Sequence, residues 1–179
     1  ANFYAAQTWT NTGKRVFQIG WMRAGKYPGM PFNQQMSFPC ELTLQTTGRG
    51  MRLCRTPVQR IAELYQGEES FTDQSLEAGR KIVSAKEGEV FDIDVEVEAQ
   101  PGLSFTIQVC GLPVNFSDGQ LSCLGEQAPL HLSGETLDLR FLVDRTSIEI
   151  FADGGSICLS SCFVPDALGT YVELISSCS

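Results

Sequence analysis

Apolar and polar residues alternate along most of this chain, and a period of two predicts β-strands rather than helices. The clearest case is the segment 91–98, in which four apolar residues alternate with four acidic ones. Short segments of the same kind, separated by Pro-Gly or Asp-Gly turns, predict an antiparallel β-sandwich over residues 71–179. A stretch of that length can have a core of its own. The further segments are 104–111, 137–143, 147–154, 156–163 and 170–176.

The first 55 residues alternate in the same way, but in shorter segments. A long loop rich in Gly and Pro, 23–35, interrupts them, and loops of this length are commonly functional or disordered. Four consecutive antiparallel strands predict one sheet, or one blade of a β-propeller. The four segments are 2–10, 14–22, 36–46 and 50–55.

Between these two parts the period becomes helical. Thr56, Pro57 and Gln59 match an N-cap, a first-turn proline and a capping box. Gly67 suits the end of the helix. We therefore predict an all-β protein with a short amphipathic linker helix. The predicted domains are 1–55, 56–70 and 71–179, and the apolar stripe of the helix consists of Val58, Ile61, Ala62 and Tyr65.

Composition and net charge favour some classes of binding partner over others. Apolar residues make up 42% and charged residues 19%, which favours a folded chain. A net charge of −8 argues against nucleic acid and suits a neutral ligand such as a sugar. No apolar run approaches the roughly 18 residues of a membrane span, so we expect no membrane partner. The chain begins inside a strand pattern without a methionine, so we expect it to be cut from a longer one.

The cysteines are seven in number, irregularly spaced and without a CxxC motif, and His131 is the only histidine. We therefore expect no zinc site, no other metal and no cofactor. Free buried thiols are the favoured interpretation, and a disulfide framework is the alternative. The cysteines are Cys40, Cys54, Cys110, Cys123, Cys158, Cys162 and Cys178.

Two groups of carboxylates invite a functional interpretation. The acidic face of segment 91–98 could bind a cation, but alternate side chains lie about 7 Å apart along a strand, so we expect a solvated outer face. Asp144 and Glu149 could form a glycosidase pair, which requires carboxyl groups about 5–5.5 Å apart in a retaining enzyme. Turn chemistry accounts for Asp144 and Arg145 without a ligand, so we expect them to stabilise a hairpin.

Aromatic residues are concentrated near the N-terminus, next to several amides. Rings that stack on C–H faces and amides that bind hydroxyls are the mixture found in sugar pockets. The alternative is that the strands bury these rings in a core. We expect a core position for Phe3, whereas Tyr4 and Trp21 fit either interpretation. The aromatic residues are Phe3, Tyr4, Trp9, Trp21, Tyr27 and Phe32, and the amides are Gln7, Asn33, Gln34 and Gln35.

Four stretches, in their order and spacing, resemble the C-terminal part of glycoside hydrolase family 32, which includes invertases, levanases and inulinases. They are "FYAAQTW", "GWM", "MSFPCELTL" and "LVDRTSIEIFADGG". The resemblance implies a five-bladed propeller of which residues 1–55 are the last blade, followed by a β-sandwich. Cys40 departs from the pattern, because the family usually has Arg at this position in an "FPRELTL"-like strand.

The resemblance also implies which residues are not in this sequence. The family's nucleophile lies in a WMNDPNG-like motif, its transition-state stabiliser in RDP and its acid/base in a Glu-Cys motif. None of the three occurs here, and "PCE" at 39–41 has the reverse order. We therefore assign no catalytic residue to this chain and expect the chain alone to be inactive.

The implied activity of the longer protein is retaining hydrolysis of β-fructofuranosidic bonds in fructans or sucrose. By analogy Tyr4 and Trp21 are substrate-binding residues that border a fructose pocket, completed by an N-terminal catalytic propeller. The sandwich is expected to support the propeller and is a candidate for self-association into a homo-oligomer or for polymer binding. An extracellular or periplasmic location follows from a polymeric substrate.

Two other functions are consistent with the pattern. A free-standing carbohydrate-binding sandwich predicts exposed aromatic residues on a sandwich face, which the sequence provides only sparsely. A purely structural sandwich predicts no sugar binding and a loss of stability in its neighbour when it is deleted.

Overall fold

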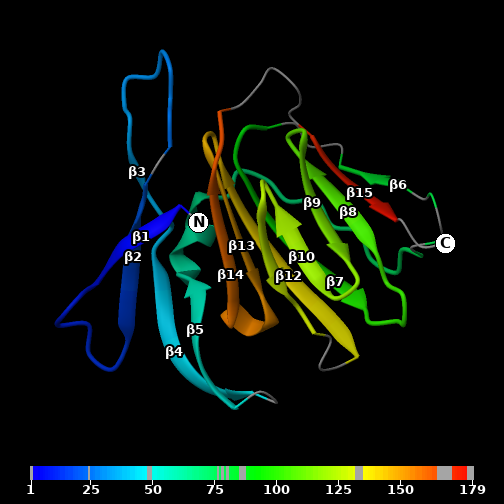
Figure 1. Ribbon diagram of the computed structural model, residues 1–179, viewed down its shortest axis with the longest axis horizontal. Coiled ribbons are helices and arrows are strands. Elements are labelled where there is room, and N and C mark those ends of the chain that lie inside the picture. Colours follow the sequence, from blue (N-terminus) through cyan, green and yellow to red (C-terminus); the bar gives the residue numbers. More distant parts are fainter. Residues whose placement is uncertain are drawn as a thin grey trace.

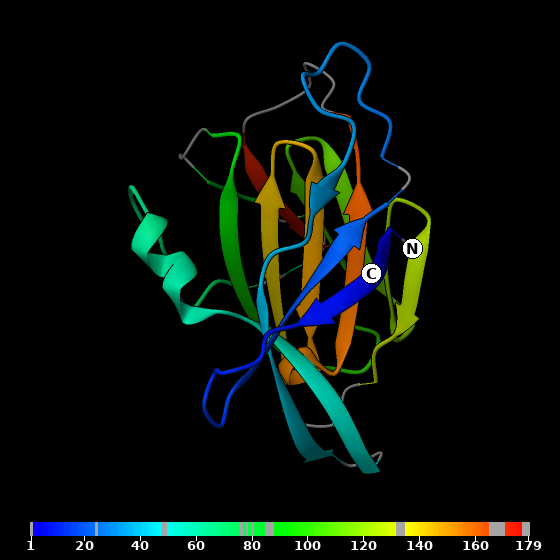
Figure 2. The ribbon, with the colours of Figure 1, turned by 90° about the vertical axis from the view of Figure 1, so that its left-hand side faces the viewer.

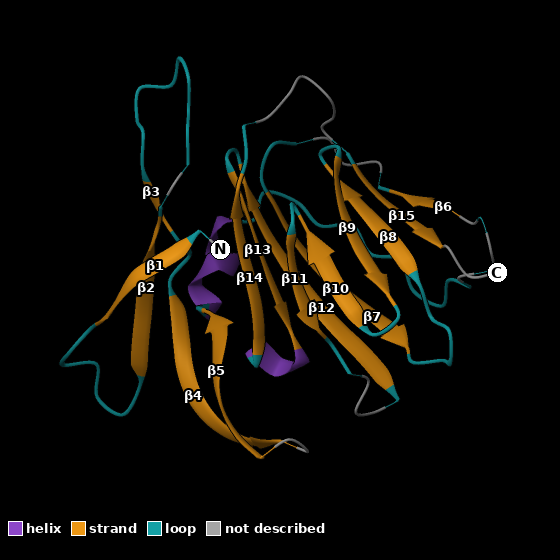
Figure 3. Cartoon of the chain, in the orientation of Figure 1, coloured by secondary structure: helices purple, strands orange, loops and turns teal. Residues whose placement is uncertain are grey.

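The computed structural model describes residues 2–23, 25–47, 50–75, 77, 79, 81–84, 88–131, 135–164 and 171–176. Strands dominate it and the helices are short (Figure 3). The strands form three antiparallel sheets (Figure 1). The prediction of an all-β antiparallel fold is therefore confirmed. No helix within the described ranges is long and apolar enough to cross a membrane.

The N-terminal strands form one sheet, which we call the blade sheet. Its strands run in the order β1-β2-β4-β5, and the short β3 pairs with β2. All four segments predicted as strands are present. Their bounds are β1 Phe3–Thr8, β2 Val16–Met22, β3 Gln35–Met36, β4 Cys40–Thr47 and β5 Gly50–Pro57.

The remaining strands form a sandwich of two sheets. A six-stranded sheet has the order β11-β10-β9-β8-β15-β6, and a four-stranded sheet has the order β14-β13-β12-β7. The six-stranded sheet contains β6 Lys81–Val83, β8 Phe105–Val109, β9 Leu112–Ser117, β10 Gln120–Cys123, β11 Glu126–Pro129 and β15 Val172–Ser176. The four-stranded sheet contains β7 Phe91–Glu98, β12 Thr136–Asp144, β13 Ser147–Ala152 and β14 Ile157–Cys162.

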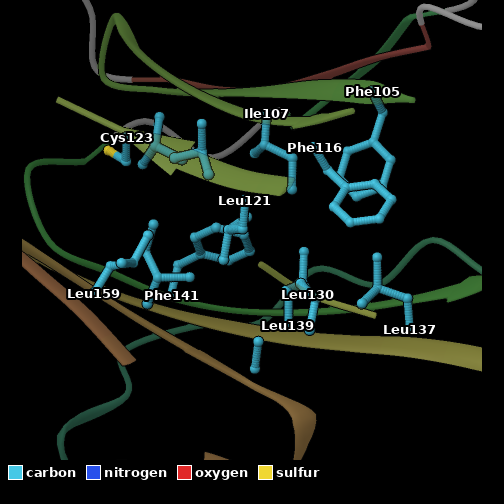
Figure 4. Packing of buried hydrophobic residues seen from close by; sticks show 14 of the residues in the cluster. Phe105, Ile107, Phe116, Leu121, Cys123, Leu130, Leu137, Leu139, Phe141 and Leu159 are labelled. Atoms are coloured by element: carbon cyan, nitrogen blue, oxygen red, sulfur yellow. The ribbon is translucent and has the colours of Figure 1, made fainter. Parts of the chain in front are cut away.

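The main hydrophobic core lies between these two sheets (Figure 4). Phe105 and Phe116 pack at a centroid distance of 5.5 Å on the six-stranded sheet, and Phe141 of β12 enters the same core from the facing sheet. All three rings are almost completely buried. The inward positions are those that the alternation of period two marks as apolar.

The linker helix is present but differs from its predicted form. It is a 3-10 helix, Gln59–Leu64, with no side-chain cap. Thr56 and Pro57, expected as N-cap and first helical residue, belong to β5, where they pair with Glu41 and Cys40. Strand pairing therefore takes the residues that the capping box needed, and the predicted apolar stripe is only partly covered. The predicted domain boundaries stay a prediction.

The blade sheet lies against the outer face of the four-stranded sheet of the sandwich (Figure 2). A second, small apolar cluster fills this junction. Cys40, Leu142 and Phe151 are its buried members, with Phe38, Ile61 and Cys158 packed around them. Because β13 contacts the sandwich core on one face and this junction on the other, all six of its residues are buried.

Candidate functional site

Tyr4 and Trp21 lie directly opposite each other on β1 and β2. Their ring centroids are 6.1 Å apart and the ring planes are inclined by 62°, an edge-to-face arrangement. The Arg23 guanidinium lies 4.3 Å from the centroid of the Tyr4 ring. Tyr4 is 52% exposed, so this pair forms an open aromatic surface rather than part of a core.

The backbone beside Tyr4 is irregular. The pairing of β1 with β2 shifts register between Tyr4 and Gln7, and Ala5 has a φ of +46°. A left-handed conformation costs an alanine on the order of 1 kcal/mol, because its Cβ approaches the following carbonyl oxygen. Irregularities of this kind redirect side chains and occur often next to functional sites.

Gln34 adds a polar group to this surface. The Trp21 indole Nε1–H donates a hydrogen bond of 2.6 Å to Gln34 Oε1. Since the amide oxygen is engaged, the amide NH₂ is the end of Gln34 that can donate to a ligand. Met36 lies opposite Trp21 on β3. We call the group Tyr4, Trp21, Arg23, Gln34 and Met36 the aromatic patch.

The aromatic patch offers ring faces, an amide and a guanidinium, but no carboxylate. Such a surface can stack on C–H groups and donate hydrogen bonds to hydroxyls, which suits a neutral polyhydroxyl ligand. It has no group able to act as an acid or a base in catalysis at neutral pH. The patch is therefore a candidate binding surface. The substrate-binding role of Tyr4 and Trp21 stays a prediction.

The other N-terminal aromatic residues lie elsewhere. The Phe3 ring packs against Gly20, where any side chain would clash with it, and the Arg55 guanidinium lies 3.9 Å from its centroid. Phe3 is half-buried and belongs to neither apolar cluster, so the expected core position is met only by its packing on Gly20 and Arg55. Tyr27 is buried and makes a tilted ring contact with Phe32, with a centroid distance of 5.2 Å and ring planes inclined by 52°. Trp9, at 48% exposure, belongs to the loop after β1.

Asp144 and Arg145 form a turn, as expected. The Asp144 carboxylate accepts a hydrogen bond of 2.8 Å from the backbone N–H of Arg145. The Arg145 side chain forms a surface ion pair with Glu89 at 2.9 Å. Asp144 and Ser147 are paired at the end of the β12–β13 hairpin. These contacts stabilise the hairpin and present no reactive group to a ligand.

Glu149 is a structural carboxylate, and its partners differ from the carboxylate pair considered from the sequence. Only 1% of it is exposed. It accepts hydrogen bonds from the Phe38 backbone N–H at 2.6 Å and from the Ser160 hydroxyl at 3.1 Å, and it forms an ion pair with Arg55 at 3.4 Å. Burial raises its pKa, and these bonds oppose that shift. Glu149 therefore joins the blade sheet to the sandwich.

The alternation of apolar and polar residues along β13 does not predict this role. Glu149 follows an inward-facing isoleucine, so the pattern assigns it to an outward face. That face is covered by the blade sheet, which the local sequence does not reveal. A carboxylate on a strand flanked by apolar residues on both sides is the signal that could have found it.

Gly155 brings the backbones of the two parts together. It has a φ of +87°, and a Cβ at this position would clash with the backbone of Arg55. The Asp-Gly-Gly turn after β13 therefore makes a close approach to β5 that only glycine allows. This contact and the bonds of Glu149 fix β5 from two directions.

Cys40 occupies the position at which the resemblance leads us to expect arginine. It is 1% exposed and packs with Leu142 and Phe151 in the junction. Burial raises the pKa of its thiol to about 11. The cationic partner of Glu149 is Arg55, which lies on the neighbouring strand β5.

The expectation of free thiols is confirmed for the six cysteines that lie within the described residues. Cys40, Cys54 and Cys123 are buried, and Cys110, Cys158 and Cys162 are partly buried. Cys178 lies outside the described residues. No group of three or more His, Cys, Asp or Glu side chains suited to a metal ion occurs in the part of the chain that the structure describes.

The acidic face of β7 is only partly solvated, contrary to expectation. Asp92 accepts two hydrogen bonds from Arg140, at 2.9 and 2.8 Å, and one from the Tyr65 hydroxyl after the linker helix. Its side chain is 8% exposed, whereas that of Asp94 is 77% exposed. The first acidic residue of β7 thus binds the linker, and Asp94, Glu96 and Glu98 remain at the surface.

Two family models match the chain in the order that the fold suggests. The N-terminal domain of glycosyl hydrolases family 32 matches residues 1–57, and the C-terminal part of the same family matches residues 111–179. Together they cover well over half of the sequence. They correspond to the blade sheet and to the greater part of the sandwich.

Relatives among characterised proteins agree with this match. A levanase of Bacillus subtilis (strain 168) is 24% identical over 98% of this chain, and a levanase of Bacillus sp. (strain L7) is 24% identical over 92%. These regions are 31% and 21% of the two relatives, so the chain spans less than a third of their length.

Solved structures share the fold. An exo-inulinase from Aspergillus awamori superposes with a TM-score of 0.85 at 22% identity, over 98% of this chain and 40% of that one. A β-fructofuranosidase from Bombyx mori superposes with a TM-score of 0.69 at 22% identity, over 98% of this chain and 38% of that one. With both family models in place and the blade–sandwich architecture present, this chain belongs to glycoside hydrolase family 32.

Proposed function

We propose that this chain is the C-terminal part of a retaining glycoside hydrolase that cleaves β-fructofuranosidic bonds. The observation that carries the proposal is the aromatic patch, in which Tyr4, Trp21 and Gln34 meet on the open face of the blade sheet. Family membership supplies the reaction class. Levanases, an exo-inulinase and β-fructofuranosidases among the matched proteins support a fructose-containing substrate.

In this proposal, the chain contributes binding and support rather than bond cleavage. A retaining mechanism needs a nucleophilic carboxylate and a second carboxyl group that acts as acid and then as base. The family motifs that carry these groups are absent from the 179 residues, and the buried Glu149 is already bonded to three partners. The reactive carboxylates would come from further propeller blades, and the chain alone would be inactive.

Tyr4 and Trp21 would border the fructosyl-binding pocket. The ring of Trp21 is held by Gln34 and by its contact with Tyr4, so it can present a fixed face to a sugar. The Gln34 amide and the Arg23 guanidinium would donate hydrogen bonds to hydroxyl groups. Location outside the cytoplasm, in the extracellular space or the periplasm, belongs to the same proposal, because fructans are large polymers.

The sandwich would serve mainly to support the propeller. The buried junction around Glu149 and Cys40 supports that role. A sugar-binding sandwich is less favoured, because Phe105, Phe116, Phe141 and Phe151 are all buried in the fold. Self-association through the sandwich and binding of longer polymer chains remain further parts of the proposal.

The experiment that tests the proposal starts from the gene that encodes this chain together with its flanking sequence. We expect the encoded protein to hydrolyse levan, inulin or sucrose with retention of configuration. Trp21→Ala should raise KM about tenfold, a loss of about 1.4 kcal/mol of binding free energy, with a smaller change in kcat. Trp9→Ala is the matched control, since Trp9 lies outside the aromatic patch.

Two results would contradict the proposal. Absence of hydrolysis of all three fructosides by the folded protein would reject the activity. An equal rise in KM for Trp9→Ala and Trp21→Ala would reject the assignment of the aromatic patch as the binding surface.

A further inference from the structure

The short segment 34–38 links the aromatic patch to the sandwich. Gln34 binds the Trp21 indole on the open side of the blade sheet. The next residue, Gln35, makes its side-chain contacts with the sandwich. Gln34 directly precedes β3, and in β3 Met36 lies opposite Trp21 while Gln35 points to the other face. The segment therefore contacts the aromatic patch on one face and the sandwich on the other.

The contact of Gln35 with the sandwich is made by the turn of the β12–β13 hairpin. The Thr146 hydroxyl donates a hydrogen bond of 2.5 Å to Gln35 Oε1, and Gln35 Nε2 donates one of 3.4 Å to the Thr146 carbonyl. Thr146 is 2% exposed, and its carbonyl also accepts a bond of 3.0 Å from the Phe163 backbone N–H. The turn that holds Gln35 is thus itself anchored in the sandwich.

The same segment is held at two further points. The Ser37 hydroxyl accepts a hydrogen bond of 2.9 Å from the Gly20 N–H, and the Ser37 N–H donates one of 2.8 Å to the Gly20 carbonyl. The Phe38 N–H donates to Glu149. Segment 34–38 is therefore fixed to β2 on one side and to the hairpin β12–β13 on the other.

We propose that the sandwich hairpin positions the substrate-binding face of the blade, with Thr146 as the residue that holds the Gln34–Trp21 pair in place through Gln35. Thr146 and Glu149 are positioning residues, since neither belongs to the aromatic patch. The consequence for saccharide binding rests on the proposed function. The effect on Trp21 does not, because it can be measured without a ligand.

The turn sequence Asp-Arg-Thr-Ser thereby divides into two roles. Asp144 closes the turn, and Arg145 pairs with Glu89 at the surface. Thr146 alone directs its side chain at the blade segment that supports Trp21. The sandwich thus helps to position the substrate-binding residue Trp21 without contacting the substrate itself.

The first measurement uses the indole N–H resonances of the chain in nitrogen-15 NMR spectra. The chain has two tryptophans, and Trp9→Phe assigns the Trp21 signal by elimination. Thr146→Val removes the hydroxyl and preserves the shape of the side chain. We expect it to shift the Trp21 resonance and to speed the hydrogen exchange of that indole at least threefold, while the Trp9 resonance stays unchanged.

Thr146→Ser and Arg145→Ala are the matched controls. The serine variant retains the donor hydroxyl and should restore the Trp21 signal. The alanine variant changes the neighbouring side chain, which is 68% exposed, and should leave that signal unchanged. An unchanged Trp21 resonance in Thr146→Val overturns the proposal, and so does an equal shift in Arg145→Ala.

Gln35→Met removes the bond from the Thr146 hydroxyl together with those that Gln35 Nε2 donates to the Thr146 carbonyl and to Cys162 Sγ. It serves as a second route if Thr146→Val does not fold. If Thr146 acts on Trp21 through Gln35, the double variant should shift Trp21 no further than Gln35→Met alone. Additive shifts would overturn the proposal, because they would show that Thr146 and Gln35 act on Trp21 independently.

The functional measurement uses the protein encoded together with its flanking sequence. Thr146→Val should raise KM for a fructoside three- to tenfold with less than a twofold change in kcat, and Thr146→Ser should restore KM. A wild-type protein that cleaves no fructoside, with a Trp21 resonance that still responds to Thr146→Val, would reject the proposed function alone. If the protein is active but neither its KM nor its Trp21 resonance changes in Thr146→Val, the positioning role alone is rejected.

Discussion

The sandwich and the blade sheet reach stability in different ways. The sandwich encloses a large core between two sheets, and the side chains of Phe105, Phe116 and Phe141 are almost completely buried there. The blade sheet instead exposes Leu44 and Leu53, which lie opposite each other on β4 and β5 at 66% and 59% exposure. The sandwich can bury its apolar side chains by itself, whereas the blade sheet depends on neighbouring parts to cover them.

The junction shows what one such neighbour supplies. Where the blade sheet meets the sandwich, Cys40 is buried in an apolar cluster and the Glu149 carboxylate collects donors from both parts. Where the blade sheet does not meet the sandwich, apolar side chains of β4 and β5 remain exposed. The blade sheet is therefore stabilised by its contacts with neighbouring parts rather than by a core of its own.

Truncation of one apolar side chain in each part tests this contrast directly. Phe141→Ala should lower the free energy of unfolding by about 3–5 kcal/mol, since it leaves a cavity in the sandwich core. Leu53→Ala should change it by less than about 0.5 kcal/mol in the chain alone, because that side chain is mostly exposed. Urea unfolding followed by circular dichroism measures both. Similar losses for the two variants would mean that the blade has a core of its own.

A somewhat smaller effect isolates the close approach of the two parts. Gly155→Ala should cost about 2–4 kcal/mol, because it combines an unfavourable positive φ with a clash against the Arg55 backbone. Gly102→Ala is the matched control, since its φ is +77° and nothing lies near the added Cβ. It should cost only about 1 kcal/mol. Equal thermal shifts for these variants would refute a tight backbone contact at Gly155.

The smallest expected effect depends on pH. Burial raises the pKa of Glu149, so its folded state binds the proton more tightly than the unfolded state does. The stability that Glu149 contributes is therefore complete below its ordinary pKa of 4.5 and is lost as pH rises through the raised value. Glu149→Gln removes this titration.

We expect Glu149→Gln to cost about 1 kcal/mol in acid, where the wild-type group is neutral, and this deficit to shrink as pH rises. Unfolding free energies of both proteins across the pH range measure the trend. A deficit that grows with pH would show that the ion pair with Arg55 outweighs the burial of the carboxylate.

The period of two was sufficient to find most of the fold. It located β1, β2, β4 and β5 of the blade sheet and β7, β8, β12, β13, β14 and β15 of the sandwich. It missed β6, β9, β10 and β11 of the six-stranded sheet, which have only three to six residues each and so show the period too briefly. It failed at Thr56 and Pro57, where local capping preferences competed with pairing to β4, a partner that local sequence cannot reveal. Tertiary pairing decided that boundary.

The candidate site was predictable only in part. Tyr4 and Trp21 were singled out as an aromatic pair, and strand register places them together. The roles of Gln35, Thr146 and Glu149 depend on contacts between residues that are 111 positions apart. The apolar neighbours of Glu149 along β13 could have marked it as buried, but no local pattern could identify its partners or the pairing of Gln35 with Thr146. Asp92 was misjudged for the same reason, since its partners Tyr65 and Arg140 come from other elements.

The complete burial of β13 has a consequence for synthesis. Phe38 precedes Glu149 by 111 residues, so at roughly 5–20 residues per second the blade leaves the ribosome on the order of ten seconds before its docking strand exists. During that interval Phe38 and Cys40 have no cover from the sandwich, and the thiol is open to oxidants. The blade is therefore the part of the nascent protein that is most open to oxidation. Its exposure ends only when the strands of the sandwich have been synthesised and dock on it.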